Sequence, residues 1–187
     1  MSHEPPAVDP MDENVLPARV RAFNATAHDY DLTRTLAGLL AEALQTNAEH
    51  LALQFENQSL SYAELAQCAW TLANHLRDAG VGAGDRVAIC MPRSPELVIA
   101  LVATLLSGAA YVPLDPDYPE ARLAQMSEDA EASLLLAYAD LSCRWLSESS
   151  TLPILNVDAT ALAQRAAQPF PCPASPDDAA YMIFTSG

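Results

Sequence analysis

The sequence has few basic residues, no long apolar run and no closely spaced cysteines, and each of these absences disfavours a class of protein. Only nine of the 187 residues are Lys or Arg against 24 Asp or Glu, so the net charge is −15. Phosphate groups repel such a chain, which disfavours binding to nucleic acid and to an anionic membrane surface. No stretch reaches the roughly 18 consecutive apolar residues of a membrane span. The acidic, proline-rich start also lacks the basic and apolar regions of a secretory signal.

The cysteines and histidines show no pattern of a metal site. The four cysteines are far apart: Cys68, Cys90, Cys143 and Cys172. The first two lie in apolar periodic segments, where a buried thiol packs as a small hydrophobic group. The four histidines are isolated and lack metal-ligand spacing: His3, His28, His50 and His75. We therefore expect no metal site and a reducing, cytoplasmic compartment.

Helix-like and strand-like segments alternate along the chain, which has 51% hydrophobic residues. Periodicity predicts helices over 35–44, from Ser61 to about Gly80, over 96–106 and over 119–129. In the first helix, Leu36, Leu39, Leu40 and Leu44 recur at helical spacing. Short apolar runs predict strands at 51–55, 86–90, 110–114, 133–138, 152–157 and 179–184, with a tight turn at Asn57-Gln58. This order predicts an α/β fold with a mainly parallel sheet flanked by helices, whereas residues 1–17 are expected to be a mobile acidic, proline-rich tail.

Local signals mark several helix ends. Ser61 and Glu64 have the spacing of a capping box, in which each side chain binds the other residue's backbone amide. Ser94 precedes Pro95, which favours a helix beginning there. Gly80 is placed to end the preceding helix in the left-handed conformation. The sequence G-V-G-A-G at 80–84 follows a helix and precedes a strand, so we interpret it as a helix end and turn and not as a nucleotide loop.

The last segment is the best candidate for a functional site. The run AAYMIF at 179–184 predicts a strand buried on both faces, and Thr185, Ser186 and Gly187 follow it directly. In open α/β sheets ligands bind beyond the carboxyl ends of the strands, where a glycine and two hydroxyl groups can approach phosphate oxygens. An ordinary turn is the alternative, and the local sequence alone favours it.

Other candidate catalytic groups are better explained by structure. Asp115 and Asp117 lie among prolines in PLDPDYPE, where an aspartate typically accepts hydrogen bonds from turn amides. Ser186 lacks the G-x-S-x-G sequence that exposes a nucleophilic serine. We therefore predict no catalytic residue in this chain.

Several of these segments, taken in order, resemble adenylation domains of nonribosomal peptide synthetases. LSYAEL (60–65) and LLSGAAYVPLD (105–115) resemble the first two core motifs of that family, and AYMIFTSG (180–187) resembles the opening of the third, the phosphate loop. The connecting sequence and the entry segment FNATAHDYDL (23–32) agree, so the resemblance covers about residues 18–187. Leu106-Ser107 stands where the family usually has Lys-Ala, which we expect to have little chemical consequence.

The resemblance implies a reaction that this chain should not perform alone. In the family, a carboxylate attacks the α-phosphate of ATP with Mg²⁺, and the acyl group then passes to a carrier-protein thiol. Stabilising the triphosphate charge would supply much of the catalysis. The match ends within the phosphate loop, so residues 18–187 are expected to be an incomplete N-terminal subdomain. Only Thr185, Ser186 and Gly187 correspond to nucleotide-contacting positions, and we expect no bound ATP or Mg²⁺ and no activity.

The resemblance also implies partners and leaves alternatives open. The partners would be the remainder of the adenylation domain and a carrier protein domain. A noncatalytic docking role is a second hypothesis, in which Ser107–Asp117, with the small residues Ala109 and Ala110, binds an MbtH-like accessory protein. The alanines could equally serve only to fit a tight strand. A third possibility is part of an acyl-CoA ligase, which the proline-rich block after the second motif disfavours.

Overall fold

The computed structural model describes residues 18–138, 146, 151–165 and 168–185, and the predicted tail at 1–17 lies outside them. The chain divides into two units, residues 1–31 and 32–187. The first unit contains the short helix α1 (Ala18–Asn24), which the sequence did not predict. No helix in the described ranges combines the length and the apolar character needed to cross a membrane.

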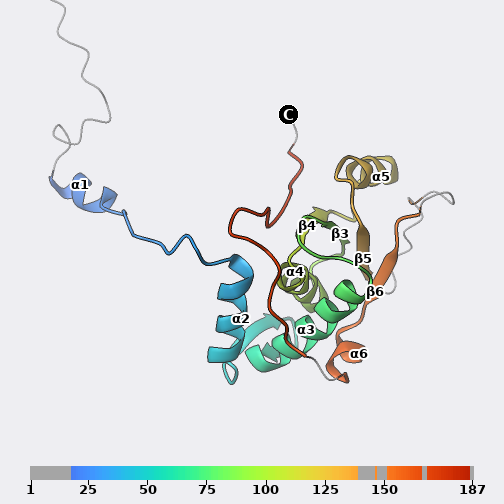
Figure 1. Ribbon diagram of the computed structural model, residues 1–187, viewed down its shortest axis with the longest axis horizontal. Coiled ribbons are helices and arrows are strands. Elements are labelled where there is room, and N and C mark those ends of the chain that lie inside the picture. The colour runs from blue at the N-terminus through green and yellow to red at the C-terminus, as the bar shows by residue number, and fades with distance from the viewer. Residues whose placement is uncertain (1–17, 139–145, 147–150, 166–167, 186–187) are drawn as a thin grey trace, which may run out of the picture. The chain divides into compact units, whose positions relative to one another are not determined.

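The second unit alternates helices and strands, much as the periodicity predicts (Figure 1). Its elements are α2 (Leu36–Thr46), β1 (Leu51–Phe55), β2 (Gln58–Ser61), α3 (Tyr62–Asp78), β3 (Arg86–Cys90), α4 (Pro95–Ser107), β4 (Ala110–Leu114), α5 (Glu120–Asp129), β5 (Leu134–Tyr138), β6 (Ile154–Val157) and α6 (Ala159–Ala163).

The central sheet has the strand order β4-β3-β5-β6, and all of its pairs are parallel. The predicted α/β class with a parallel sheet is therefore confirmed. Strands β1 and β2 form a separate antiparallel hairpin, in which Phe55 pairs with Gln58. The turn is thus Glu56-Asn57, one residue earlier than predicted, and Glu56 adopts a φ of +50°.

Helices cover both faces of the parallel sheet, and its side chains alternate between them. Val87 and Ile89 of β3 join the larger core cluster, which also contains residues of α2, α3, α4 and α6. Ala88 and Cys90 point to the opposite face and pack with Leu123 and Met126 of α5. The near-continuous apolar sequence of β3 follows from this burial on two faces.

The predicted helix caps are present. The Ser61 hydroxyl accepts a hydrogen bond from the Glu64 amide, and the Glu64 carboxylate accepts one from the Ser61 amide. Ser94 accepts from the Leu97 amide. Gly80 has a φ of +87°, and the Val81 amide next to it donates to the Leu76 carbonyl, as in a Schellman motif.

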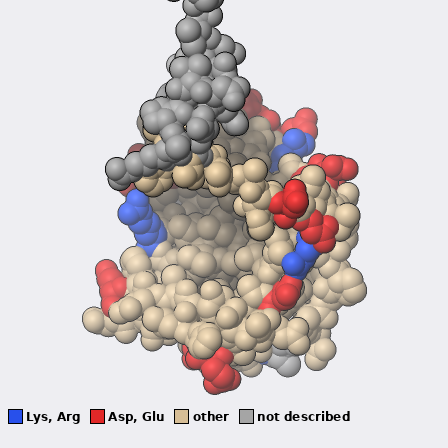
Figure 2. Space-filling view, turned by 90° about the vertical axis from the view of Figure 1, so that its left-hand side faces the viewer, with Lys and Arg blue, Asp and Glu red and all other residues tan. Residues whose placement is uncertain are grey.

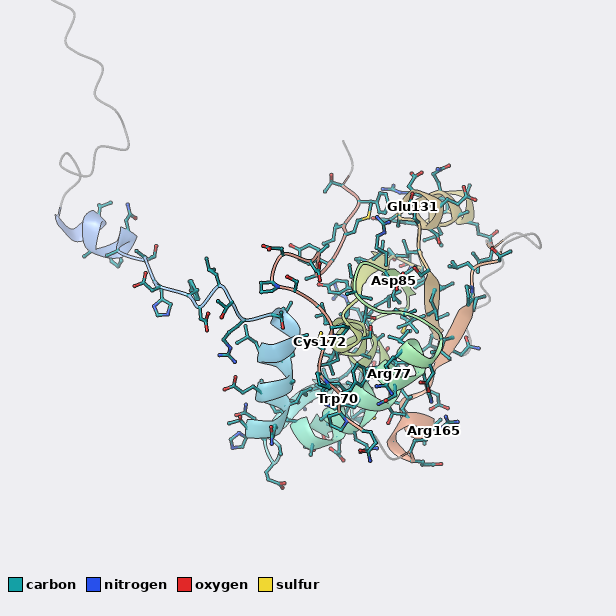
Figure 3. All side chains as sticks on the ribbon, in the orientation of Figure 1. Trp70, Arg77, Asp85, Glu131, Arg165 and Cys172 are labelled. Carbon is teal, nitrogen blue, oxygen red and sulfur yellow. The ribbon has the colours of Figure 1, made fainter. Side chains whose placement is uncertain are left out.

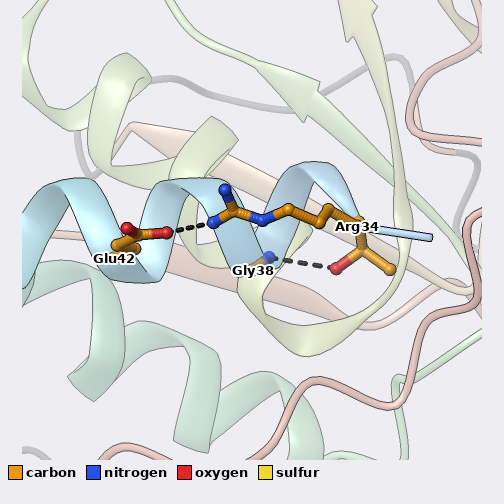
Figure 4. A network of polar contacts seen from close by, with 4 residues as sticks. Arg34, Gly38 and Glu42 are labelled. Carbon is orange, nitrogen blue, oxygen red and sulfur yellow. Dashed lines mark hydrogen bonds and ion pairs between the residues drawn. The ribbon is translucent and has the colours of Figure 1, made fainter. Parts of the chain in front are cut away.

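Helix α2 forms as predicted, but only some of its regularly spaced leucines are buried. Thr35 caps it by accepting from the Gly38 amide, and Arg34 pairs with Glu42 along its exposed side (Figure 4). Its most buried residues are Ala37 and Leu44, whereas Leu36 and Leu39 are exposed. The leucine spacing therefore identified the helix, but the alanines, which allow close approach, lie toward the core.

The segment at 179–184 differs most from its prediction. It forms no regular strand, and one isolated parallel bridge joins Tyr181 to Tyr111. The side chains of Tyr181 and Ile183 are 56% and 57% exposed, whereas Met182 and Phe184 pack against the second core cluster. The prediction of burial on both faces was wrong because only one face of this segment packs against the described core.

Candidate functional site

The carboxyl ends of β3 and β4 border an open groove. Cys90 and Leu114, the last residues of these strands, lie opposite each other in the parallel register. The groove has a volume of about 570 Å³ and is lined by Met91–Arg93, Leu97, Pro113–Tyr118 and Ile183-Phe184, among others. This is the edge at which open α/β sheets bind ligands.

The backbone of the last segment brings Thr185 to this edge. The Tyr111 amide donates to the Ala180 carbonyl at 3.2 Å, and the Met182 amide donates to the Tyr111 carbonyl at 3.0 Å. Among the described residues no regular pairing continues beyond Tyr181, but Ile183 and Phe184 line the groove together with Leu114, and Thr185 follows them directly. Thr185 is exposed, and Ser186 and Gly187 lie outside the described residues.

The charges at this edge do not by themselves attract a polyphosphate. Among the groove-lining residues Arg93 is basic, whereas Asp115 and Asp117 are acidic. Asp115 has the predicted turn role, because its carboxylate accepts from the Asp117 amide and its carbonyl accepts from the Tyr118 amide. The described residues therefore form the shape of the groove, but they supply little positive charge to bind a polyphosphate.

Outside the groove, the described residues on the face shown in Figure 2 form no concentrated patch of charged side chains. Figure 2 shows the face on the side of α2, where uncharged side chains predominate and acidic and basic ones are scattered. Within the described residues no group of three or more His, Cys, Asp or Glu side chains could hold a metal ion. The site is therefore defined by the topology of the sheet.

Residues 168–182, which we call the strap, cross the outside of α3 and α4 before reaching β4. The Phe170 ring packs edge-on against Trp70, with centroids 5.3 Å apart, and the Arg77 guanidinium lies 4.3 Å from the Phe170 centroid. Asn74 donates to the Gln168 carbonyl at 2.9 Å. Figure 3 shows Trp70, Arg77 and Cys172 along this path. From the sequence, residues 169–176 were expected to be a proline-rich loop that leads into the strand predicted at 179–184.

The turn between α4 and β4 fixes the middle of the strap. The Cys172 thiol lies 3.6 Å from the Leu105 carbonyl. Gly108 adopts a φ of +91°, and a Cβ atom there would lie 2.7 Å from Cγ of Pro173. Contact this close requires glycine, which explains Gly108 within the second motif.

The strap also bears on the docking surface predicted at Ser107–Asp117. Ala109 and Ala110 are only 1% and 5% exposed, and Ser107 is equally buried. Asp115 and Asp117 are the exposed residues of that range. The two alanines are therefore not surface residues as that hypothesis assumed, because they lie beneath neighbouring chain that includes the strap.

Two features outside the groove have structural roles. Asp85, directly after the 80–84 turn, accepts from the Gly82 amide and from the Ser133 hydroxyl, which ties the start of β3 to the loop before β5.

Cys68 is buried on α3, and this burial, with a smaller effect of Glu64 and Glu96, raises the pKa of its thiol. An inert packing role for Cys68 follows.

Comparison with known proteins places this geometry in a family. The AMP-binding enzyme family matches residues 40–187. Tyrocidine synthase 2 of Brevibacillus parabrevis is 40% identical over 166 residues, which cover 89% of this chain and 4% of that protein. The nonribosomal peptide synthetase FmoA3 with AMPPNP bound superposes with a TM-score of 0.77 at 28% identity, covering 91% of this chain and 18% of FmoA3.

A third relative is the N-terminal subdomain of Klebsiella oxytoca NpsA. It superposes with a TM-score of 0.70 at 29% identity, over 84% of this chain and 40% of that subdomain. The fold is thus that of the N-terminal subdomain of adenylate-forming enzymes. The chain belongs to the AMP-binding enzyme family, and its relatives include the adenylation domains of nonribosomal peptide synthetases.

Proposed function

We propose that this chain forms the first part of the large N-terminal subdomain, residues 18–187, of an amino-acid-activating adenylation domain in a longer protein. The observation that supports this most is the parallel bridge between Tyr111 and Tyr181, after which Ile183 and Phe184 line the groove at the carboxyl end of the sheet in a member of the AMP-binding family. The short share of each relative that the chain spans is consistent with this proposal.

Within that domain, Thr185, Ser186 and Gly187 would contact the phosphates of ATP. ATP would be the substrate, and an amino-acid carboxylate would attack its α-phosphate to release pyrophosphate. The described residues do not fit a Mg²⁺ site on their own, and so we assign no step to the metal. Of these three residues the structure describes Thr185 alone, and we expect the isolated chain to be inactive.

The test is amino-acid-dependent ATP–pyrophosphate exchange. We expect no exchange with the 187-residue chain and clear exchange with the longer polypeptide read from the same reading frame. Exchange by the 187-residue chain would overturn the proposal that the activity requires the residues of the longer polypeptide that this chain does not contain. A longer polypeptide that folds, binds ATP and yet exchanges with no amino acid would overturn amino-acid activation.

The remainder of the domain would pack on the groove and on the exposed side chains of Tyr181 and Ile183. The side chains of these two residues are more than half exposed, although their neighbours Met182 and Phe184 pack against the second core cluster. A carrier protein domain would then receive the acyl group, in the cytoplasm. Cross-linking from a cysteine placed at Ile183 should reach residues that follow Gly187 in the longer polypeptide.

Two alternatives have their own tests. If the chain docks an MbtH-like protein through residues 107–117, the exposed Asp117 is the place to test it, and Asp117→Arg should weaken a pull-down. If the longer protein is an acyl-CoA ligase, a fatty or aryl acid should support hydroxamate formation better than any amino acid. The identity to Tyrocidine synthase 2 favours amino-acid activation over this ligase.

A further inference from the structure

One residue of β4 fixes how the last segment lies against the sheet. The Tyr111–Tyr181 bridge is isolated, and the two backbone hydrogen bonds that accompany it both involve Tyr111. A regular strand pair would fix its register through several bonds along its length. The register of residues 181–185 therefore depends on few contacts, and side chains must contribute to it.

The alternation of side chains excludes only some registers. Met182 and Phe184 pack into the second core cluster, while Tyr181 and Ile183 lie on the exposed side. A slip of one residue would exchange these two faces and expose the packed pair. A slip of two residues would keep every side chain on its face and move Thr185 by about 7 Å along the sheet.

The tyrosine rings distinguish the observed register from a slip of two. The rings of Tyr111 and Tyr181 are stacked, with centroids 5.7 Å apart and planes 24° apart. A slip of two would place Ala179 or Ile183 opposite Tyr111, and neither has a ring to stack. The anchor at Pro173 does not prevent such a slip, because residues 174–180 separate it from Tyr181.

We propose that Tyr111 and Tyr181 are positioning residues, whose stacked rings set the register of residues 181–185 and thereby place Thr185 at the carboxyl end of β4 for ATP. This inference rests on the proposed function for its consequence, but the register itself can be measured without nucleotide. Neither ring is assigned a contact with substrate.

The first experiment measures amide hydrogen exchange at Met182 in the 187-residue chain. Tyr181→Val removes the ring at a half-exposed position, so the core remains intact, and Tyr181→Phe keeps the ring. We expect the protection factor of the Met182 amide to fall about three- to tenfold in Tyr181→Val and to change less than about twofold in Tyr181→Phe. Ile183→Val, on the same face, is the matched control and should leave Met182 protected. Equal protection in Tyr181→Val and wild type would overturn the proposal.

The second experiment measures the consequence in the longer polypeptide. Tyr181→Val should raise the KM for ATP about three- to tenfold, because only the fraction in the correct register binds ATP well. The KM for the amino acid should change less than about twofold, Tyr181→Phe should restore the wild-type value, and Tyr30→Val should have no effect. A purely structural role would lower the apparent kcat and leave both KM values unchanged, which would overturn positioning. A wild-type polypeptide without exchange would refute the proposed function, while the Met182 protection would still decide the register.

Discussion

Ser61 and Glu64 cap α3 through two reciprocal hydrogen bonds, and the Ser61 amide and hydroxyl, which both donate to the Glu64 carboxylate, lower the pKa of that carboxyl below its ordinary value. A carboxyl whose pKa is lowered on folding stabilises the protein above its unfolded pKa, and this contribution is lost as pH falls through the folded value. Glu64→Ala should therefore destabilise the chain at pH 7 and have little effect near pH 3. Urea unfolding of both proteins from pH 3 to 7 measures this, and a pH-independent difference would contradict it.

Removing the hydroxyl of the same cap should act at every pH, and more strongly where Glu64 is ionised, because the hydroxyl also donates to its carboxylate. Ser61→Ala leaves the Glu64 amide without its side-chain partner and should cost about 1 kcal/mol of unfolding free energy. Thr160→Ala, at an exposed position in α6, is a control that leaves the Asp158 cap in place, because that cap uses the backbone amides of residues 160 and 161 and not the Thr160 side chain. Urea unfolding of the three proteins provides the comparison, and an equal effect of both substitutions would show that the cap contributes nothing specific.

The Cys68 thiol should be unreactive in the folded protein. Its side chain is 1% exposed and its pKa is raised by burial, so little thiolate forms and reagents cannot reach it. Because the folded pKa is above the unfolded one, any related stability is present below about pH 8.5 and is lost at higher pH. Peptide-level iodoacetamide labelling should modify the half-buried Cys172 well before Cys68 at pH 8. Equal rates under native conditions would contradict this interpretation.

At the scale of elements, substitutions at three glycines can distinguish the cost of a strained backbone conformation from the cost of a steric clash. Gly82 has neither a positive φ nor a near neighbour for a Cβ atom, Gly80 has a φ of +87° in open space, and Gly108 has both a φ of +91° and the contact with Pro173. Substitution by Ala should have little effect at Gly82, cost about 1 kcal/mol at Gly80 and cost more at Gly108. Thermal unfolding of the three variants tests this order, and a Gly108→Ala protein as stable as Gly80→Ala would remove the role of the Pro173 contact.

The elements that the sequence predicted well are those with local signals. Ser61, Ser94 and Gly80 mark helix ends through hydrogen bonds within a few residues. The residues of β3 after Arg86 are all apolar because helices cover both faces of the strand. Helix α6 was not predicted, because five residues are too few to show a helical period.

What could not be predicted depends on tertiary packing. The buried face of α2 is set by close approach at Ala37, and the half exposure of Tyr181 depends on which neighbours are present. The position of Thr185 was expected from the resemblance and the strand order. The strap that holds it was not, because Phe170 and Pro173 contact residues far away in sequence, and no local pattern records such contacts.

At the scale of the whole molecule, apolar exposure and net charge oppose each other. The exposed side chains of Tyr181 and Ile183 beside the groove favour association, whereas a net charge of −15 keeps copies of the chain apart. Salt screens the repulsion over a Debye length that falls from about 10 Å at 0.1 M to about 3 Å at 1 M. We therefore expect the 187-residue chain to sediment as a monomer at low salt and to associate increasingly as salt is raised.

The face responsible for this association can be identified with two substitutions of equal charge. Ile183→Asp lies beside the groove and should abolish the salt-dependent association, whereas Leu39→Asp, on the exposed side of α2, should leave it intact. Sedimentation velocity at low and high salt provides the measurement. If both variants associate like the wild type, the groove is not the surface through which copies of the chain associate. If Leu39→Asp alone prevents association, then copies of the chain associate through α2. In that case the exposure of Tyr181 and Ile183 no longer supports the proposal that the rest of the domain packs on them.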